Sequence, residues 1–181
     1  MREPDPETVR RAQAGDLGAF ESLVRDCQAS AWRLAYHLTG NRATADDVTQ
    51  EAFVRAFRSL ASFRGQWKFT SWLLRIVHNC AMDAHRRGRR EERLLARTAE
   101  PPTAVSVSAL ADERLRIGQA VAALPRELRE PFVVIEVLGH SYQEASAILG
   151  VKTGTLKSRM HRARAALVRE LTEHEETADE M

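Results

Sequence analysis

Apolar residues recur at helical spacing along almost the whole chain. From Leu17 to Leu38 they fall every three or four positions and so share one helical face: Phe20, Val24, Cys27, Ala31, Leu34 and Leu38. Similar spacing predicts helices from Thr44 to Leu60 and from about Thr70 through Ala84. A short helix after Asp5-Pro6 and further amphipathic stretches beyond residue 110 extend the pattern. The sequence therefore predicts an all-α fold.

Two breaks in this pattern divide the chain. Residues 61–69 lose the periodicity but keep Phe63, Trp67 and Phe69, which predicts a loop that carries aromatic side chains. Residues 96–109 contain Pro101-Pro102 and mostly small side chains, a composition typical of a flexible linker. We therefore expect two small helical domains, at 1–95 and 110–170, joined by the linker and followed by an acidic tail at 171–181.

The segment from Ser141 to Arg164 has the pattern of a helix-turn-helix. Ser141 and Glu144 have the spacing of a capping box, Gly150 suits a tight turn, and Thr153 can cap the second helix. The inner face of that helix would consist of Leu156, Met160, Ala163 and Leu167. In a helix-turn-helix the second helix enters the major groove of DNA. The expected DNA contacts are Thr155, Lys157, Ser158, Arg159 and Arg162.

The helix before this motif contains a conflict that the sequence does not resolve. Leu124-Pro125 predicts a helix with proline at its first position, and Gly139 predicts its end. Pro131 falls inside that helix and should kink or interrupt it, because proline has no backbone N–H and its ring clashes with the preceding turn.

Charge is distributed unevenly, although the net charge of the 181 residues is only +2. Residues 61–93 hold eight bases against three acids, residues 141–169 hold six against one, and residues 170–181 hold six acids and no base. Two separate basic blocks favour two contacts with a polyanion. The absence of a long apolar run indicates a soluble, cytoplasmic protein without membrane insertion. Cys27 and Cys80 lie in apolar-periodic segments, and we expect buried thiols.

Two stretches of the chain resemble one family in the family's order. The C-terminal stretch ALPRELREPFVVIEVLGHSYQEASAILGVKTGTLKSRMHRARAAL resembles the domain of group IV, or extracytoplasmic function, bacterial sigma factors that binds the minus-thirty-five promoter element. The N-terminal stretches TADDVTQEAFVRAFRSLASF and FTSWLLRIVHNCAMDAHRR resemble the promoter-melting domain of the same family. The resemblance covers about residues 8–95 and 110–170.

The resemblance implies partners and site residues. Core RNA polymerase would bind through its β′ clamp helices and its β flap, and the residues expected to face the clamp helices are Asp47, Gln50 and Glu51. Residues expected at the minus-ten element are Phe63, Arg64, Trp67, Lys68, Asn79, Asp83, Arg86 and Arg87. From their chemistry alone, Phe69 and Trp72 are better explained as core aromatics, whereas Phe63 and Trp67 fit either role. An anti-sigma factor is a further candidate partner.

Two other functions are compatible with parts of the sequence. An autonomous helix-turn-helix regulator would bind operator DNA as a dimer, but it would not need the aromatic and arginine-rich segment 63–90. A metal-dependent nuclease would have to use Asp46, Asp47 and Glu51, which is a sparse ligand set. The sequence shows no nucleophile elbow, phosphate-binding loop or metal-ligand spacing, so we expect no catalytic site, metal or cofactor.

Overall fold

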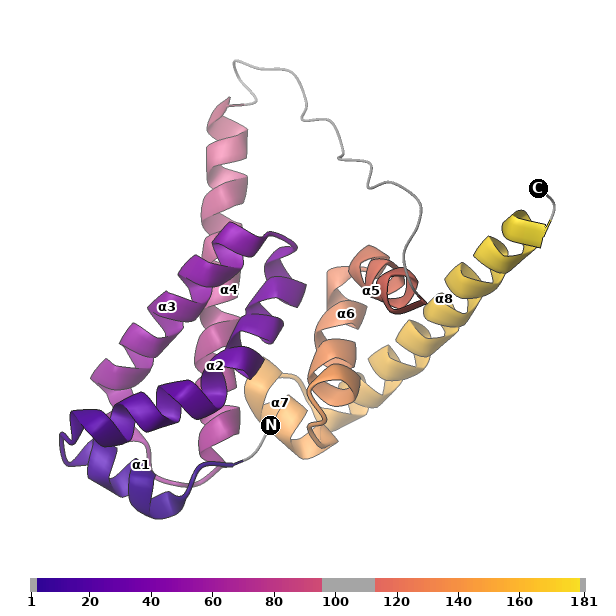
Figure 1. Ribbon diagram of the computed structural model, residues 1–181. Helices are drawn as coiled ribbons and strands as arrows, with labels where there is room; N and C mark the ends of the chain where they lie inside the picture. The colour runs from indigo at the N-terminus through magenta and orange to yellow at the C-terminus, as the bar shows by residue number, and fades with distance from the viewer. Residues whose placement is uncertain (1–2, 96–112, 180–181) are drawn as a thin grey trace.

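The computed structural model describes residues 3–95 and 113–179, and every regular element in these ranges is a helix (Figure 1). The N-terminal lobe contains α1 (Pro6–Gln13), α2 (Leu17–Thr39), α3 (Arg42–Ser59), the 3-10 turn η1 (Leu60–Ser62) and α4 (Phe69–Leu95). The C-terminal lobe contains α5 (Glu113–Ala123), α6 (Arg126–Phe132), the π-helical η2 (Val133–Val137), α7 (Tyr142–Leu149) and α8 (Thr153–Asp179). The expected all-α fold with two helical domains is confirmed.

The predicted linker and the predicted acidic tail have different outcomes in the structure. The linker predicted at 96–109 lies outside the described residues. The acidic tail predicted to start at 171 begins inside α8, whose helical backbone continues to Asp179.

The core of the N-terminal lobe lies between α2, α3 and α4. Small and branched side chains alternate there, and the fully or almost fully buried positions include Ala31, Leu34, Ala45, Val48, Ala52, Leu74 and Val77. Alanines let the helix backbones approach closely, and the leucines and valines fill the remaining space. Both cysteines are buried, as predicted, and burial raises the pKa of each thiol, to about 12 for Cys27.

The starts of α3 and α4 differ from the prediction. Helix α3 begins at Arg42 instead of Thr44, because the side chain of Asn41 accepts a hydrogen bond from the Thr44 backbone N–H at 3.0 Å. Gly40, with φ of 68°, ends α2 and lets the chain turn directly into this cap. Helix α4 begins at Phe69, where the distant Glu3 carboxylate accepts the first N–H groups.

Pro131 changes the helix type without ending the helix. Residues 126–132 are α-helical with Pro131 inside, and the chain continues as the π-helical η2. There the Leu138 N–H donates to the carbonyl of Val133, five residues earlier, at 3.0 Å. Proline donates no hydrogen bond to the carbonyl four residues earlier, and the helix continues past it with the wider π-helical spacing. Pro125 occupies the cap position of α6, one residue before the first helical position expected for it.

The helix-turn-helix has the predicted local structure. The Ser141 hydroxyl accepts from the Glu144 N–H at 3.2 Å, and the Glu144 carboxylate accepts from the Ser141 N–H at 2.8 Å, which completes the capping box. Gly150 has φ of 69° in the turn. Thr153 is the first residue of α8 and not its cap. The predicted inner face is buried at all four positions: Leu156, Met160, Ala163 and Leu167.

The two lobes pack against each other. Helix α7 lies along α4, and α6 and η2 contact α2 (Figure 1). One cluster of buried apolar side chains extends through both lobes, from Leu34 and Leu74 to Leu128, Val134 and Ile148. The helix-turn-helix is therefore fixed relative to the N-terminal domain by its first helix.

The turn glycine generates a stability prediction. Gly150→Ala should cost about 1–2 kcal/mol, because φ is positive while no atom lies within 4 Å of the added methyl group. Gly154→Ala, in the first turn of α8 and equally free of neighbours, should stabilise by about 0.4–1 kcal/mol. Urea unfolding measures both changes. Equal effects of the two substitutions would show that the turn conformation is not what Gly150 supplies.

Candidate nucleic-acid interface

The loop between η1 and α4, residues 63–68, carries the first group of predicted site residues and is called the aromatic loop below. Arg64, Trp67 and Lys68 are exposed, and the Trp67 side chain is 52% exposed. Phe63 is half-buried and packs on Phe69 and Trp72, with ring centroids 5.7 and 5.2 Å away. Phe69 is buried, as its reading as a core aromatic predicts. Trp67 is thus the aromatic side chain in this loop with a face open to solvent.

A cavity of about 740 Å³ opens beside the aromatic loop. The loop contributes Phe63, Arg64, Gly65 and Trp67 to its lining, and the N-terminal segment contributes Glu3, Pro4, Pro6, Val9, Arg10 and Gln13. Its volume lies within the range of roughly 300–1,000 Å³ that is usual for small-ligand sites. The lining combines apolar surface with two arginines, Arg10 and Arg64. Apolar surface can stack against a planar base and arginine can pair with a phosphate, so this composition suits a nucleotide. Nothing in the sequence predicted that the N-terminal segment forms one wall of this cavity.

Helix α4 presents the second group of predicted residues. Asn79, Arg86 and Arg87 are exposed on its surface. Asp83 is half-buried and accepts hydrogen bonds from Arg55 at 2.8 Å and from Arg86 at 2.7 Å. These two guanidinium groups, Arg55 foremost, hold the pKa of Asp83 below its ordinary value. Asp83 therefore orients two arginines and presents little free negative charge.

The predicted polymerase-facing residues lie on α3, next to the same arginine network. Asp47 and Gln50 are exposed, and Glu51 is half-buried and accepts from Arg55 at 2.7 Å. A groove of about 300 Å³ between α3 and α4 is lined by Asp47, Val48, Glu51, Cys80 and Arg87, among others. Arg55 thus bridges a predicted polymerase contact and a predicted DNA contact. Sequence reasoning missed this role, although the spacing of four between Glu51 and Arg55 was a signal for their pairing.

Asp46, the remaining carboxylate considered for a nuclease site, pairs with a tryptophan. Asp46 accepts a hydrogen bond from the indole N–H of Trp32 at 2.6 Å. Within the described ranges, no three histidine, cysteine, aspartate or glutamate side chains come close enough together to hold a metal ion. The arrangement gives the nuclease hypothesis no support.

The predicted base-reading residues lie at the start of α8. Thr155, Lys157, Ser158 and Arg162 are exposed, and Arg159 is half-buried. The Ser158 hydroxyl donates to the Thr155 carbonyl at 2.9 Å, and Arg162 lies 3.9 Å from Glu127. Further along, Arg164 pairs with Glu136 at 2.6 Å. Lys157 and Arg159 take part in neither the Arg162–Glu127 pair nor the Arg164–Glu136 pair. Both belong to the first turns of the helix, and in this motif the first turns meet the base edges.

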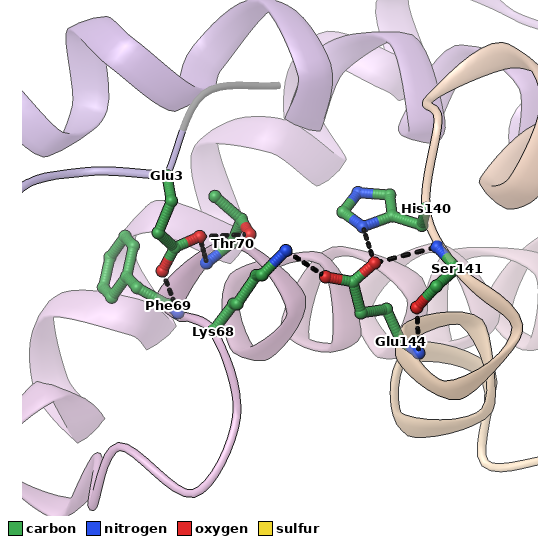
Figure 2. A network of polar contacts seen from close by, with 7 residues as sticks. All are labelled: Glu3, Lys68, Phe69, Thr70, His140, Ser141 and Glu144. Atoms are coloured by element: carbon green, nitrogen blue, oxygen red, sulfur yellow. Dashed lines mark hydrogen bonds and ion pairs between the residues drawn. The ribbon is translucent and has the colours of Figure 1, made fainter.

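A polar network joins the aromatic loop to the helix-turn-helix (Figure 2). The Lys68 ammonium group lies 2.7 Å from the Glu144 carboxylate, and His140 Nδ1 lies 3.6 Å from the same group. Partial burial opposes ionisation of Glu144, but hydrogen bonds from Lys68 and Ser141 outweigh it and hold its pKa at about 2. Burial, partly opposed by Glu144, lowers the pKa of His140. Glu144 therefore serves both the capping box and the contact between lobes.

A second polar contact between the lobes is buried. His78 of α4 and Glu130 of α6 lie 3.5 Å apart, and Arg126 pairs with Glu130 at 2.5 Å. Burial would raise the pKa of Glu130, but these two partners lower it below its ordinary value. On the same face of α4, the Arg75 guanidinium group donates to the Ala147 carbonyl of α7 at 3.4 Å. Except for the buried His78–Glu130 pair, these polar contacts lie at the rim of the apolar contact between α4 and α7.

Comparison with known proteins identifies the class. The family model described as Sigma-70 region 2 matches residues 23–91, and the one described as Sigma-70, region 4 matches residues 114–167. The two matches fall on the N-terminal and C-terminal lobes, so the fold belongs to the sigma-70 class.

Similar curated proteins narrow the assignment. The ECF RNA polymerase sigma factor SigE of Mycolicibacterium smegmatis is 39% identical over 95% of this chain and 71% of its own length. The RNA polymerase sigma-H factor of Pseudomonas aeruginosa is 34% identical over 92% of this chain and 93% of its own. The chain belongs to the extracytoplasmic function (ECF) family of RNA polymerase sigma factors. It is thus a sigma factor, which directs promoter-specific transcription, and the autonomous regulator is not favoured.

Solved structures have the same architecture. CnrH, in complex with the cytosolic domain of CnrY, is 28% identical and superposes with a TM-score of 0.69 over 92% of this chain and 96% of that one. The sigma factor RpoE, in complex with the anti-sigma factor NepR from Bartonella quintana, is 24% identical with a TM-score of 0.68 over 84% and 96% of the two chains, and shares the fold. In the part of this chain that the structure describes, no helix has the length and apolar character needed to cross a bilayer.

The Glu144 network generates a pH prediction. A carboxyl whose folded-state pKa is depressed to about 2 stabilises the protein above its ordinary pKa of 4.5, and this contribution is lost as the pH falls from there toward 2. Glu144→Gln should remove on the order of 2 kcal/mol at neutral pH and flatten the acid part of the stability profile. Glu127→Gln, a change at an exposed glutamate of the same lobe, is the control. Urea unfolding at several pH values measures both; an unchanged acid slope in Glu144→Gln would contradict the prediction.

Proposed function

We propose that this sigma factor opens the minus-ten element with its N-terminal lobe and reads the minus-thirty-five element with α8, while α3 docks on core RNA polymerase. The single observation that carries this proposal is the placement of an exposed tryptophan at a cavity at the start of α4, a helix that carries exposed cations further along its length. A protein that only binds duplex DNA has no use for a solvent-exposed stacking surface of this kind.

Opening DNA requires contacts that compensate for the lost stacking between base pairs. Separating a duplex costs about 1.4 kcal/mol per base-pair step, and stacking a base on an aromatic side chain returns roughly 1–3 kcal/mol. Trp67 offers the stacking face, and Arg64 and Lys68 supply charge for the adjacent phosphates. Asn79, Arg86 and Arg87 line the surface of α4 for the neighbouring duplex edge, with Arg86 oriented by Asp83. Phe63 supports the cavity wall from within the aromatic cluster.

Recognition of the upstream element would depend on the first turns of α8. In the major groove, arginine and lysine make their most specific contacts with guanine O6 and N7. We assign such contacts to Lys157 and Arg159, and phosphate or mixed contacts to Thr155, Ser158 and Arg162. Arg162 would exchange its loose contact with Glu127 for a phosphate.

Docking on polymerase would use the acidic surface of α3. Asp47 and Glu51 line the groove between α3 and α4, and Gln50 is exposed on the same helix. A basic or polar helix of the β′ clamp fits this surface, and the β flap would contact the C-terminal lobe. An anti-sigma factor that covers these surfaces would keep the protein from polymerase.

Engaging both promoter elements requires the lobes to separate. The element names imply about 25 base pairs between them, or roughly 85 Å at about 3.4 Å per base pair. In this structure α4 and α7 are in contact, and Lys68 is paired with Glu144. Binding of the minus-ten element would therefore transfer Lys68 from Glu144 to DNA.

The proposed stacking contact generates a prediction at Trp67. Trp67→Ala should leave binding of minus-thirty-five duplex DNA and of core polymerase unchanged, but lower open-complex formation about 5- to 150-fold, corresponding to roughly 1–3 kcal/mol. Permanganate reactivity of unpaired thymines measures the opening. Tyr36→Ala, at an exposed aromatic residue of α2, is the control. Normal thymine reactivity in Trp67→Ala would remove Trp67 from the melting step.

A second prediction separates base reading from phosphate binding on α8. Arg159→Ala should cost about 1–3 kcal/mol on the matched upstream element and relax its sequence preference. Arg162→Ala should instead weaken binding to all sequences alike and lower the slope of log affinity against log salt by about 0.9. Titrations of matched and scrambled duplexes at several salt concentrations distinguish the two. Equal losses on both duplexes for Arg159→Ala would exclude it from base readout.

A further inference from the structure

The aromatic loop is tied at both ends to the N-terminal segment. At its start, the Gln13 side-chain amide donates to the carbonyl of Leu60 at 3.1 Å and to that of Phe63 at 2.9 Å. At its end, the Glu3 carboxylate accepts from the Phe69 N–H at 2.5 Å and from the Thr70 hydroxyl at 2.5 Å, with a longer contact to the Thr70 N–H (Figure 2). These contacts cross 47 to 67 residues of sequence.

The N-terminal segment is itself anchored. Val9 and Ala12 of α1 are buried in one apolar cluster with Leu23, Leu60 and Phe69. Pro4, between Glu3 and α1, is also buried. Glu3 and Gln13 therefore project from a backbone that is packed on the lobe, and their hydrogen bonds can resist displacement of the loop.

The aromatic loop has few constraints of its own. Residues 64–68 are all exposed, and Gly65 has φ of 69°. Phe63 is the loop side chain that packs into the aromatic cluster. A segment without helical hydrogen bonds or buried side chains takes its shape from the attachments at its ends. Here those attachments are the Gln13 amide and the Glu3 carboxylate, together with the exposed Lys68–Glu144 pair that promoter binding would release.

We propose that Glu3 and Gln13 are positioning residues for promoter opening, which hold the aromatic loop so that its cavity faces an unstacked base. They act through the loop and do not touch DNA. The inference deepens the proposed function and rests on it. It also assigns a role to a segment that precedes residue 23, where the family-model match begins.

The test uses two isosteric substitutions that each reverse a hydrogen-bonding group. Glu3→Gln replaces one accepting oxygen by an NH2 donor, which then faces the N–H and O–H donors of Phe69 and Thr70. Gln13→Glu turns an acceptor toward the two carbonyl groups of Leu60 and Phe63. In reconstituted holoenzyme, each should lower the rate of promoter opening about 2- to 30-fold, the range expected from losing a capping contact. Affinities for core polymerase and for minus-thirty-five duplex should stay at the wild-type level. Glu21→Gln and Gln28→Glu, on the exposed surface of α2, are the matched controls.

A double-mutant cycle distinguishes positioning from general stability. If Glu3 and Gln13 act through the loop, their substitutions should add little to the opening defect in a Trp67→Ala background. Full additivity, or equal losses in the controls, would overturn the inference. Because the two variants alter opposite ends of the loop, failure of one to fold leaves the other as the test.

The outcomes also separate this inference from the proposed function. A defective Trp67→Ala beside normal opening in Glu3→Gln and Gln13→Glu overturns the positioning role alone. Normal opening in Trp67→Ala overturns base capture by the loop, and the positioning role with it.

Discussion

Burial of α4 on two sides is the constraint on which the rest of the molecule depends. Helix α4 contacts α2 and α3 of its own lobe and α7 of the other lobe, and its Leu74 and Val77 are fully buried. Burial of each such side chain contributes about 1.5–3 kcal/mol. The helical period then leaves Asn79, Arg86 and Arg87 on the remaining surface. The row of groups proposed to meet DNA is thus positioned by the same register that fills the core.

Local features were predictable from the sequence because their partners are close along the chain. The capping box joins residues three apart, and the turn at Gly150 depends on the backbone of one residue. The error at the start of α3 is of the same local kind. Asn41 and Thr44 are both good caps, and the chain uses Asn41 because Gly40 has already turned the backbone out of α2.

Contacts between distant segments could not be predicted, because no periodicity marks them. Glu3 reads as one acidic residue near a terminus, and Gln13 as one polar position of a short helix. Their roles at the aromatic loop depend on how α1 packs over η1 and the start of α4. The candidate site residues could therefore be predicted from their chemical pattern, whereas the side chains that hold this pattern in place required the structure. Arg55, which joins Glu51 to Asp83, is a further example.

The contact between the lobes divides into a strong apolar part and a weak ionic part. Lys68 is 61% exposed in its pair with Glu144, and exposed ion pairs contribute only about 0–1 kcal/mol. The shared apolar cluster contributes far more, since it includes fully buried residues of α2, α4, η2 and α7. Exchange of Glu144 for a DNA phosphate at Lys68 therefore costs little by itself. Separation of the lobes must instead be offset by contacts that replace the apolar surface, and a large protein partner can supply these where DNA alone cannot.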